Sequence, residues 1–170
     1  MKKALIIVAQ KAFQPDEYLH TREMLEKSGI SVKTASSKIG EAIGYYDVKA
    51  NIDFAISSVS ADFDAFVIIG GAGARNFLKD KALIKLLQIA NKDRRIIAGI
   101  CIAPIILAEA GILNGRKATV WNGDSEQEKF LISKGAKYIH QPVVVDGNII
   151  TADGPDSAYE FGKTIAKILG

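Results

Sequence analysis

The sequence predicts an α/β fold, a three-layer sandwich in which helices cover both faces of a mostly parallel central sheet. Two observations predict it. Short apolar runs alternate along the chain with segments of helical periodicity, as in sheets built from strand–helix–strand units. The strongest runs are apolar at every position, which indicates strands buried on both faces. The length of 170 residues fits a single domain, residues 1–170, with a sizeable core.

The first part of the chain begins with this alternation. Residues 3–9 are strand-like, and residues 15–28 have the periodicity of a helix, with Gly29 placed to end it. Residues 30–35 are the next strand. Residues 45–60 are the least regular segment and are expected to hold a small hairpin outside the main sheet.

The rest of the chain continues the pattern. The expected elements, in order, are a strand at 65–69, a helix at 76–90, a strand at 95–100, a helix at 102–110 stopped by Gly111, a strand at 118–121, a helix at 125–133, a strand at 137–140 and a closing helix at 155–169. Between the last two lies a hairpin, 143–145 and 148–151, whose Asp146-Gly147 pair suits a two-residue turn.

Composition excludes several classes of function. Hydrophobic residues make up 48% and charged residues 24% of the chain, as in a soluble globular protein, and the net charge is only +3. The absence of a basic cluster argues against nucleic-acid binding. No apolar run reaches the roughly 18 residues that span a bilayer. The charged start, Met1-Lys2-Lys3, imitates a signal peptide, but the short apolar run after it is better interpreted as a first strand.

The only cysteine, Cys101, follows a buried strand and precedes a helix. One cysteine cannot form an internal disulfide, which favours a reducing cytoplasm. A thiol on a strand-to-helix corner is held exposed above the sheet, and free backbone N–H groups there lower its pKa. A small buried hydrophobe is the alternative interpretation, because free cysteines are often inert.

Two other loops are expected beside Cys101, because ligands of parallel sheets bind beyond the carboxyl ends of the strands. They are residues 10–16 and the glycine-rich residues 70–74. Residues 70–74 lack the third glycine of a dinucleotide-binding turn and a Walker lysine, so no cofactor is predicted. Gly70 and Gly71 instead let a backbone N–H approach a substrate oxygen, and with the N–H of Ile102 this would form an oxyanion hole. A plain tight turn is the alternative.

Acidic residues open the first helix. Asp16 and Glu17 complement the helix dipole, which explains them without a catalytic role. The alternative, catalytic hypothesis places Glu17 beside Cys101. There a protonated carboxyl could donate a hydrogen bond to sulfur and act as a general acid or base.

The two histidines are less informative. His20 is three residues after Glu17 and could reach the same pocket, although an ordinary half-exposed helix histidine is the alternative. His140 is interpreted as structural. Two histidines and one cysteine do not make a metal site, so no metal is predicted.

These motifs resemble the ThiJ/PfpI superfamily over nearly the whole chain. The resemblance rests on the strand at 4–9 followed by Glu17, on Ile69-Gly70-Gly71, on Gly99-Ile100-Cys101 with Pro104 after it, and on residues 144–148 and 151–161. It implies a flavodoxin-like, class I glutamine amidotransferase-like fold, a homodimer or higher homo-oligomer, a Cys101 nucleophile and a Glu17 partner. It also implies that Asp153, Gly154 and Pro155 lie near the active site across a subunit contact.

The chain departs from the family pattern where histidines are expected. Protease-like members carry histidine directly after the cysteine, where this chain has Ile102. Deglycase-like members carry histidine in the stretch that here contains Trp121 and Asn122, and Ala103 replaces a familiar glycine. Thiol proteases need a base beside the nucleophile, so a cysteine peptidase is disfavoured.

The leading functional hypothesis is a cofactor-free glyoxalase or deglycase that acts on small reactive carbonyls through Cys101 and Glu17. The first alternative is a redox-sensing or chaperone-like stress protein with an oxidisable Cys101. A further alternative is that the fold is retained only for binding or assembly, with Ile102 and Trp121 narrowing the pocket.

Overall fold

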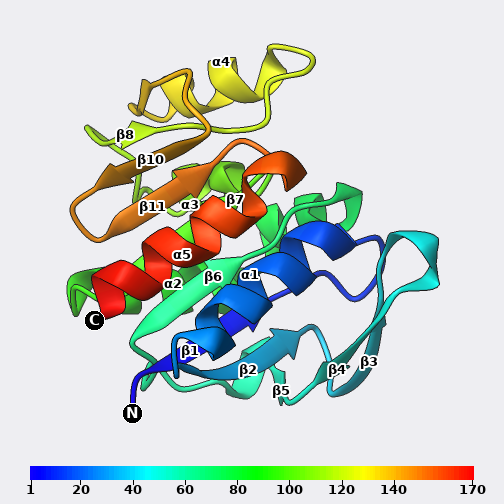
Figure 1. Ribbon diagram of the computed structural model, residues 1–170. Coiled ribbons are helices and arrows are strands. Elements are labelled where there is room, and N and C mark those ends of the chain that lie inside the picture. The colour runs from blue at the N-terminus through cyan, green and yellow to red at the C-terminus, as the bar shows by residue number, and fades with distance from the viewer.

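The computed structural model describes residues 1–170 and is built on a seven-stranded sheet (Figure 1). The strands are β1 (Lys3–Ile7), β2 (Ser31–Ser36), β5 (Phe54–Ala55), β6 (Ala65–Ile68), β7 (Ile96–Ile100), β10 (Val143–Asp146) and β11 (Ile149–Ala152). Their order across the sheet is β10-β11-β7-β6-β1-β2-β5. All neighbours are parallel except β10 and β11. The predicted fold class is confirmed.

Helices cover both faces of this sheet. Helices α1 (Pro15–Lys27) and α5 (Ala158–Leu169) pack against each other on one face, in front of the sheet in Figure 1. Helices α2 (Lys81–Lys92) and α3 (Pro104–Glu109) lie on the other, and α4 (Glu126–Ser133) lies beside β8 (Lys117–Ala118) and β9 (Lys137–Tyr138). No helix is both long enough and apolar enough to cross a membrane.

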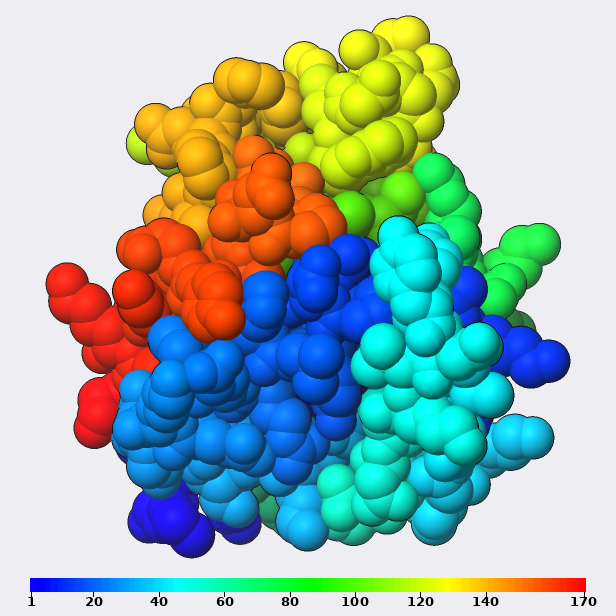
Figure 2. Space-filling view, turned by 45° about the vertical axis from the view of Figure 1, so that its right-hand side comes forward, coloured from blue at the N-terminus to red at the C-terminus, as the bar shows by residue number.

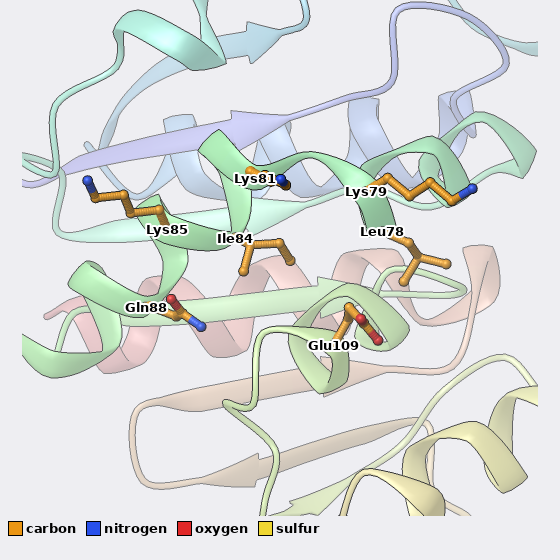
Figure 3. Close-up of a pocket in the computed structure, with 7 residues that line it drawn as sticks. All are labelled: Leu78, Lys79, Lys81, Ile84, Lys85, Gln88 and Glu109. Atoms are coloured by element: carbon orange, nitrogen blue, oxygen red, sulfur yellow. The ribbon is translucent and has the colours of Figure 1, made fainter.

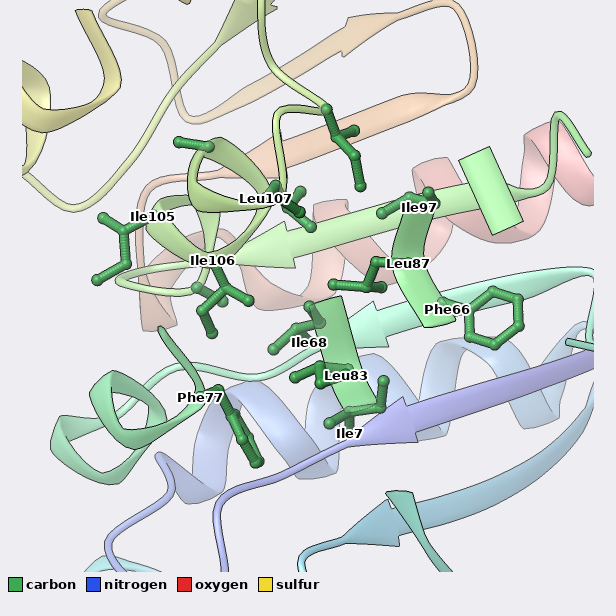
Figure 4. Packing of buried hydrophobic residues seen from close by; sticks show 14 of the residues in the cluster. Ile7, Phe66, Ile68, Phe77, Leu83, Leu87, Ile97, Ile105, Ile106 and Leu107 are labelled. Atoms are coloured by element: carbon green, nitrogen blue, oxygen red, sulfur yellow. The ribbon is translucent and has the colours of Figure 1, made fainter. Parts of the chain in front are cut away.

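The core consists of two apolar clusters separated by the sheet. Alternate residues of β1 point to opposite faces, so Ile7 joins the cluster under α2 and α3 while Ile6 joins the one under α1 and α5. Figure 4 shows the first cluster, in which Leu83 of α2 and Ile106 of α3 approach Ile7 and its neighbours. The central strands are therefore apolar on both sides, as the sequence predicts.

The segment expected to be irregular forms the hairpin of β3 (Gly40–Ile43) and β4 (Lys49–Ile52), outside the main sheet. It begins before residue 45, and β5, which follows it, joins the edge of the main sheet. A 3₁₀ turn, Tyr45–Asp47, makes its tip. The hairpin is tied to the loop after β1, since Tyr45 donates its N–H to the Phe13 carbonyl at 3.0 Å. Figure 2 shows it as the cyan ridge against the blue start of the chain.

Two expected helices have other bounds. The helix predicted at 76–90 is a 3₁₀ helix, Ala72–Lys79, followed by α2, because the Asp80 carboxylate accepts the N–H of Leu83 at 3.0 Å and starts a new helix. The helix predicted at 102–110 starts at Pro104, because Pro at a first helical position fixes its φ.

The strands predicted at 118–121 and 137–140 are also corrected. They shorten to β8 and β9, which pair only with each other. The C-terminal helix starts later than predicted, since Pro155–Ser157 is a 3₁₀ turn ahead of α5.

Candidate active site

Cys101 is the apex of a sharp corner between β7 and α3. Its φ is 62°, a left-handed conformation that is uncommon for a residue with a side chain. Backbone hydrogen bonds hold it on both sides: its N–H donates to the Ala152 carbonyl at 2.9 Å, and its carbonyl accepts from the Trp121 N–H at 2.8 Å. The surrounding structure thus fixes a conformation that costs energy, which is common at functional sites. The thiol is half-buried, so it is neither freely exposed nor sealed in the core.

Glu17 reaches this corner from the first turn of α1. The turn is fixed by Gln14, whose side-chain oxygen accepts the Glu17 N–H at 2.8 Å as an N-cap. The Glu17 side chain is completely buried. Its Oε2 accepts the Gly70 N–H at 2.8 Å, while Oε1 has no hydrogen-bond partner. A buried carboxylate oxygen with no partner is costly, whereas a proton on it could be donated to a neighbouring acceptor.

Gly70 is the residue that lets Glu17 and Cys101 meet. A Cβ at position 70 would lie 2.7 Å from the Cys101 Cβ, 2.8 Å from Glu17 Oε2 and 2.9 Å from the Ile100 carbonyl oxygen. No side chain fits between those three atoms. The sequence predicts that Gly70 allows a ligand to approach closely. In the structure Gly70 allows the Glu17 carboxyl to approach the Cys101 thiol.

Burial controls the electrostatics of the pair. Removal from water raises the pKa of Glu17 to about 7, against the smaller effects of the Gly70 N–H and of Cys101, which lower it. The prediction that the pKa of Cys101 is lowered is wrong, because burial raises it by more than the backbone N–H groups lower it, and the neighbouring Glu17 carboxylate raises it further. The low dielectric disfavours two negative charges here. Near neutral pH Glu17 therefore gains or loses a proton at little cost, which suits general acid–base chemistry, whereas the raised pKa of Cys101 keeps its proton on sulfur.

The backbone N–H groups of Ile102 and Gly71 form hydrogen bonds to the Cys101 sulfur. These bonds oppose the rise of its pKa. Gly71 has a φ of 101°, and a Cβ there would overlap the Ala12 carbonyl oxygen. These are the donors predicted for an oxyanion hole. In the structure both are directed at the sulfur, and their role as an oxyanion hole stays a prediction.

The thiol opens into a hollow of about 230 Å³. The residues that line it are Gln14, Tyr45, Gly71, Ala72, Arg75, Cys101, Ile102 and Trp121. Sequence reasoning identified Gly71, Cys101, Ile102 and Trp121 among these. It missed Tyr45 and Arg75, which come from the hairpin tip and from the 3₁₀ helix after β6. Gln14 lies in the loop 10–16, which is predicted from the position of ligands beyond the carboxyl ends of parallel strands.

Several predicted pocket residues do not line this hollow. His20 stacks on Tyr159 of α5, with ring centroids 4.0 Å apart, and Asp16 is exposed at the start of α1. Asn122 donates to the Glu128 carboxylate at 2.8 Å. Neither His20 nor His140 is among the residues around the thiol.

The loop at Asp153, Gly154 and Pro155 lines a neighbouring hollow that shares Trp121 with the first. Ser157 donates its hydroxyl to the Asp153 carboxylate at 2.6 Å and holds the loop. The subunit contact that would bring this region to Cys101 stays a prediction.

No group of three or more His, Cys, Asp or Glu side chains is placed to hold a metal ion. A larger hollow, about 770 Å³, lies on the α2 and α3 side and is lined by long side chains such as Lys79, Lys81 and Lys85 (Figure 3). It contains none of the residues that surround the thiol. Its size is therefore no sign of catalytic chemistry.

Comparison with known proteins agrees with the fold. Residues 2–168 match the model of the DJ-1/PfpI family. An uncharacterized protein of Methanocaldococcus jannaschii is 36% identical over 98% of this chain and 82% of its own length. A deglycase of Pyrococcus abyssi is 28% identical over 97% of this chain and 98% of its own. The crystal structure of a ThiJ/PfpI domain protein from Brachyspira murdochii superposes with a TM-score of 0.93, at 32% identity, over 98% of this chain and 95% of that one.

Proposed function

Because the chain belongs to the DJ-1/PfpI family, we propose that it is an enzyme of the glyoxalase or deglycase type, in which Cys101 attacks a small reactive carbonyl compound. The observation that carries the proposal is the fully buried Glu17 carboxyl against the Cys101 thiol, with one carboxyl oxygen unpartnered. The existence of relatives named deglycase supports the same reaction class.

The first step is addition of the Cys101 sulfur to the aldehyde carbon of an α-oxo aldehyde. The C–S bond forms, and the aldehyde oxygen becomes an alkoxide that takes the thiol proton and so becomes the hydroxyl of a hemithioacetal. The N–H groups of Gly71 and Ile102, which already surround the sulfur, are the donors available to that oxygen while it is charged.

The second step moves a proton between the two carbons. Glu17 removes the proton from the former aldehyde carbon and returns one to the adjacent carbon. The hydroxyl proton of the hemithioacetal passes to the adjacent carbonyl oxygen, and the hemithioacetal becomes a 2-hydroxy thioester. The raised pKa of Glu17, about 7, matches a group that must accept and donate a proton at neutral pH. Water then cleaves the thioester, which releases a 2-hydroxy acid and restores the thiol, with no external oxidant or reductant.

Methylglyoxal turnover by three variants tests the proposal. We expect Cys101→Ser and Glu17→Gln each to lose at least about a hundredfold in kcat/KM, since each removes a group that takes part in bond making or proton transfer. Glu26→Gln is the matched control, an exposed carboxylate of the same helix that lines neither the thiol hollow nor its neighbour, and we expect the wild-type rate. Equal rates in all four proteins would refute the proposal.

A second function, redox sensing at Cys101, is favoured by one feature: neither histidine lines the thiol hollow, and sensing requires no further proton shuttle. A thiolate attacks peroxide to give a sulfenate and water, and a second peroxide gives a sulfinate. Mild peroxide treatment followed by intact-mass measurement tests it. We expect a gain of two oxygen atoms in wild type and none in Cys101→Ser, and an unmodified wild-type mass would exclude it.

A further inference from the structure

We infer that the thiol hollow selects carbonyl compounds that carry an anionic group, a carboxylate or a phosphate, and that Arg75 is the residue that recognises this group. The inference rests on the proposed function, because it specifies the substrate class of the same site. It is drawn from the hydrogen-bonding groups that line the hollow.

Arg75 is the only permanently charged side chain in the lining. It lies on the 3₁₀ helix that follows Gly71, so the segment that supplies an N–H to the sulfur also supplies the cation. Arg75 takes part in no ion pair, although nine such pairs occur elsewhere in the molecule. No aspartate or glutamate lines the hollow to neutralise it.

The other polar side chains of the hollow also offer donors. The Gln14 side-chain oxygen is occupied by the Glu17 N–H, which leaves its amide N–H₂ group without a protein partner. The Tyr45 hydroxyl oxygen accepts the Ala72 N–H at 2.6 Å, so its own proton is left to be donated. The hollow thus offers guanidinium, amide and hydroxyl donors and no side-chain carboxylate acceptor, a set that fits negatively charged oxygens.

The size of the hollow limits the ligand. At about 230 Å³ it lies below the roughly 300–1,000 Å³ of pockets that hold drug-sized ligands. The expected substrate is therefore an aldehyde or α-oxo aldehyde of a few heavy atoms, with its carbonyl at Cys101 and its anionic group at Arg75.

An isosteric pair of alkylating reagents tests this without requiring turnover. Iodoacetate transfers a carboxymethyl group and neutral iodoacetamide a carbamoylmethyl group to the thiolate sulfur, each with loss of iodide, and the two reagents differ mainly in charge. The measured quantity is the ratio of their rates at Cys101, normalised to the ratio for a free small thiol. The proteins are wild type, Arg75→Gln and Lys79→Gln, a matched control that removes a cation from the same 3₁₀ helix but outside the hollow.

We expect Arg75→Gln to lower the iodoacetate-to-iodoacetamide ratio roughly three- to tenfold, and added salt to lower the ratio only while Arg75 is present. Lys79→Gln should keep the wild-type ratio. An unchanged ratio in Arg75→Gln, an equal fall in both variants, or a Cys101 that neither reagent labels would each overturn the inference.

Protection of Cys101 from iodoacetamide distinguishes the two anionic groups. Glyoxylate tests the carboxylate and glycolaldehyde phosphate tests the phosphate, with neutral glycolaldehyde as the reference. We expect at least one anionic aldehyde to protect at a several-fold lower concentration than glycolaldehyde in wild type, and this advantage to vanish in Arg75→Gln. Equal protection by all three overturns the inference, whereas absent methylglyoxal turnover alone refutes only the proposed reaction.

Discussion

Two hollows of this molecule, the one on the α2 and α3 side and the thiol hollow, differ in what builds them. The larger, about 770 Å³, lies between long side chains on the outer surface of regular helices, and its polar groups are partly paired, as Glu109 is with Lys134 at 3.0 Å. The smaller, about 230 Å³, rests on backbone at positive φ at Gly71 and Cys101, above a fully buried carboxyl. Only the smaller one holds features that cost stability.

That difference indicates where function lies. A hollow between exposed lysines costs a folded protein little, so its presence needs no explanation. A cysteine with left-handed backbone and a buried carboxyl oxygen without a hydrogen-bond partner each reduce the stability of the folded state. Such features persist only when the structure around them fixes them. Their coincidence at one corner is the argument for an active site.

The largest effect is expected from Gly70→Ala. The added Cβ would lie under 3.0 Å from the Cys101 Cβ and from the Ile100 carbonyl oxygen, neither of which can move away alone. We expect a loss of about 3 kcal/mol in the free energy of unfolding, measured with urea, together with loss of methylglyoxal turnover.

Gly154→Ala is the matched control for this substitution. Gly154 has extended backbone with a φ of 162°, and nothing lies within 4 Å of its Cβ position. The control should stay within about 0.5 kcal/mol of wild type. An unfolding free energy of Gly70→Ala that matches the control would contradict the close approach of Glu17 and Cys101.

The buried Glu17 should make stability depend on pH. Its pKa is about 7 in the folded protein against 4.5 for an ordinary glutamate, so the folded state holds the proton more tightly. This contribution to stability is complete below about pH 4.5 and is lost as the pH rises through 7. At about 1.4 kcal/mol per pH unit the loss amounts to about 3 kcal/mol.

Urea unfolding of wild type and Glu17→Gln across this range measures the effect. Glu17→Gln removes the titration, so its stability should lack the decline between pH 4.5 and 7, and it should exceed wild type at pH 7. Glu160→Gln, which changes an exposed carboxylate, should keep the wild-type slope. Parallel curves for wild type and Glu17→Gln would show that Glu17 does not titrate in this window.

The sequence predicts the part of this site that depends on local pattern and sheet topology. Residues 96–100 are apolar throughout, so a buried strand had to end at Cys101, and parallel strands bring the loops after β1 and β6 to the same edge. Glu17 and Gly71 follow from that rule. The fold class follows from the same alternation of strands and helices.

The remainder depends on tertiary packing that no local pattern specifies. Tyr45 reaches the hollow because its hairpin folds back on Phe13, across more than thirty residues of chain. Arg75 is placed by a 3₁₀ helix, where periodicity predicts loop and then α-helix. His20 has the correct spacing from Glu17 but stacks on Tyr159, whose position depends on how α5 packs against α1.

A third prediction concerns the strained backbone at Cys101. At a φ of 62° alanine is strained and glycine is not, so Cys101→Gly should be more stable than Cys101→Ala by about 1 kcal/mol in urea unfolding. Two residues along, Ala103 has helical backbone with a φ of −57°. There the order reverses, and Ala103→Gly should destabilise the protein by about 0.5–1 kcal/mol. The same order at both positions would mean that the corner is unstrained.

The smallest effect is expected in the larger hollow, from the double substitution of Lys81→Gln and Lys85→Gln. Both lysines are exposed on α2 and neither forms an ion pair in the structure. The loss of these two charges should therefore change the unfolding free energy by no more than about 0.5 kcal/mol. Methylglyoxal turnover and the alkylation ratio at Cys101 should keep their wild-type values, because neither lysine lines the thiol hollow and salt screens charges beyond about 10 Å. A fall in turnover with unchanged stability would mean that the larger hollow contributes to the reaction, and the contrast between the two hollows would fail.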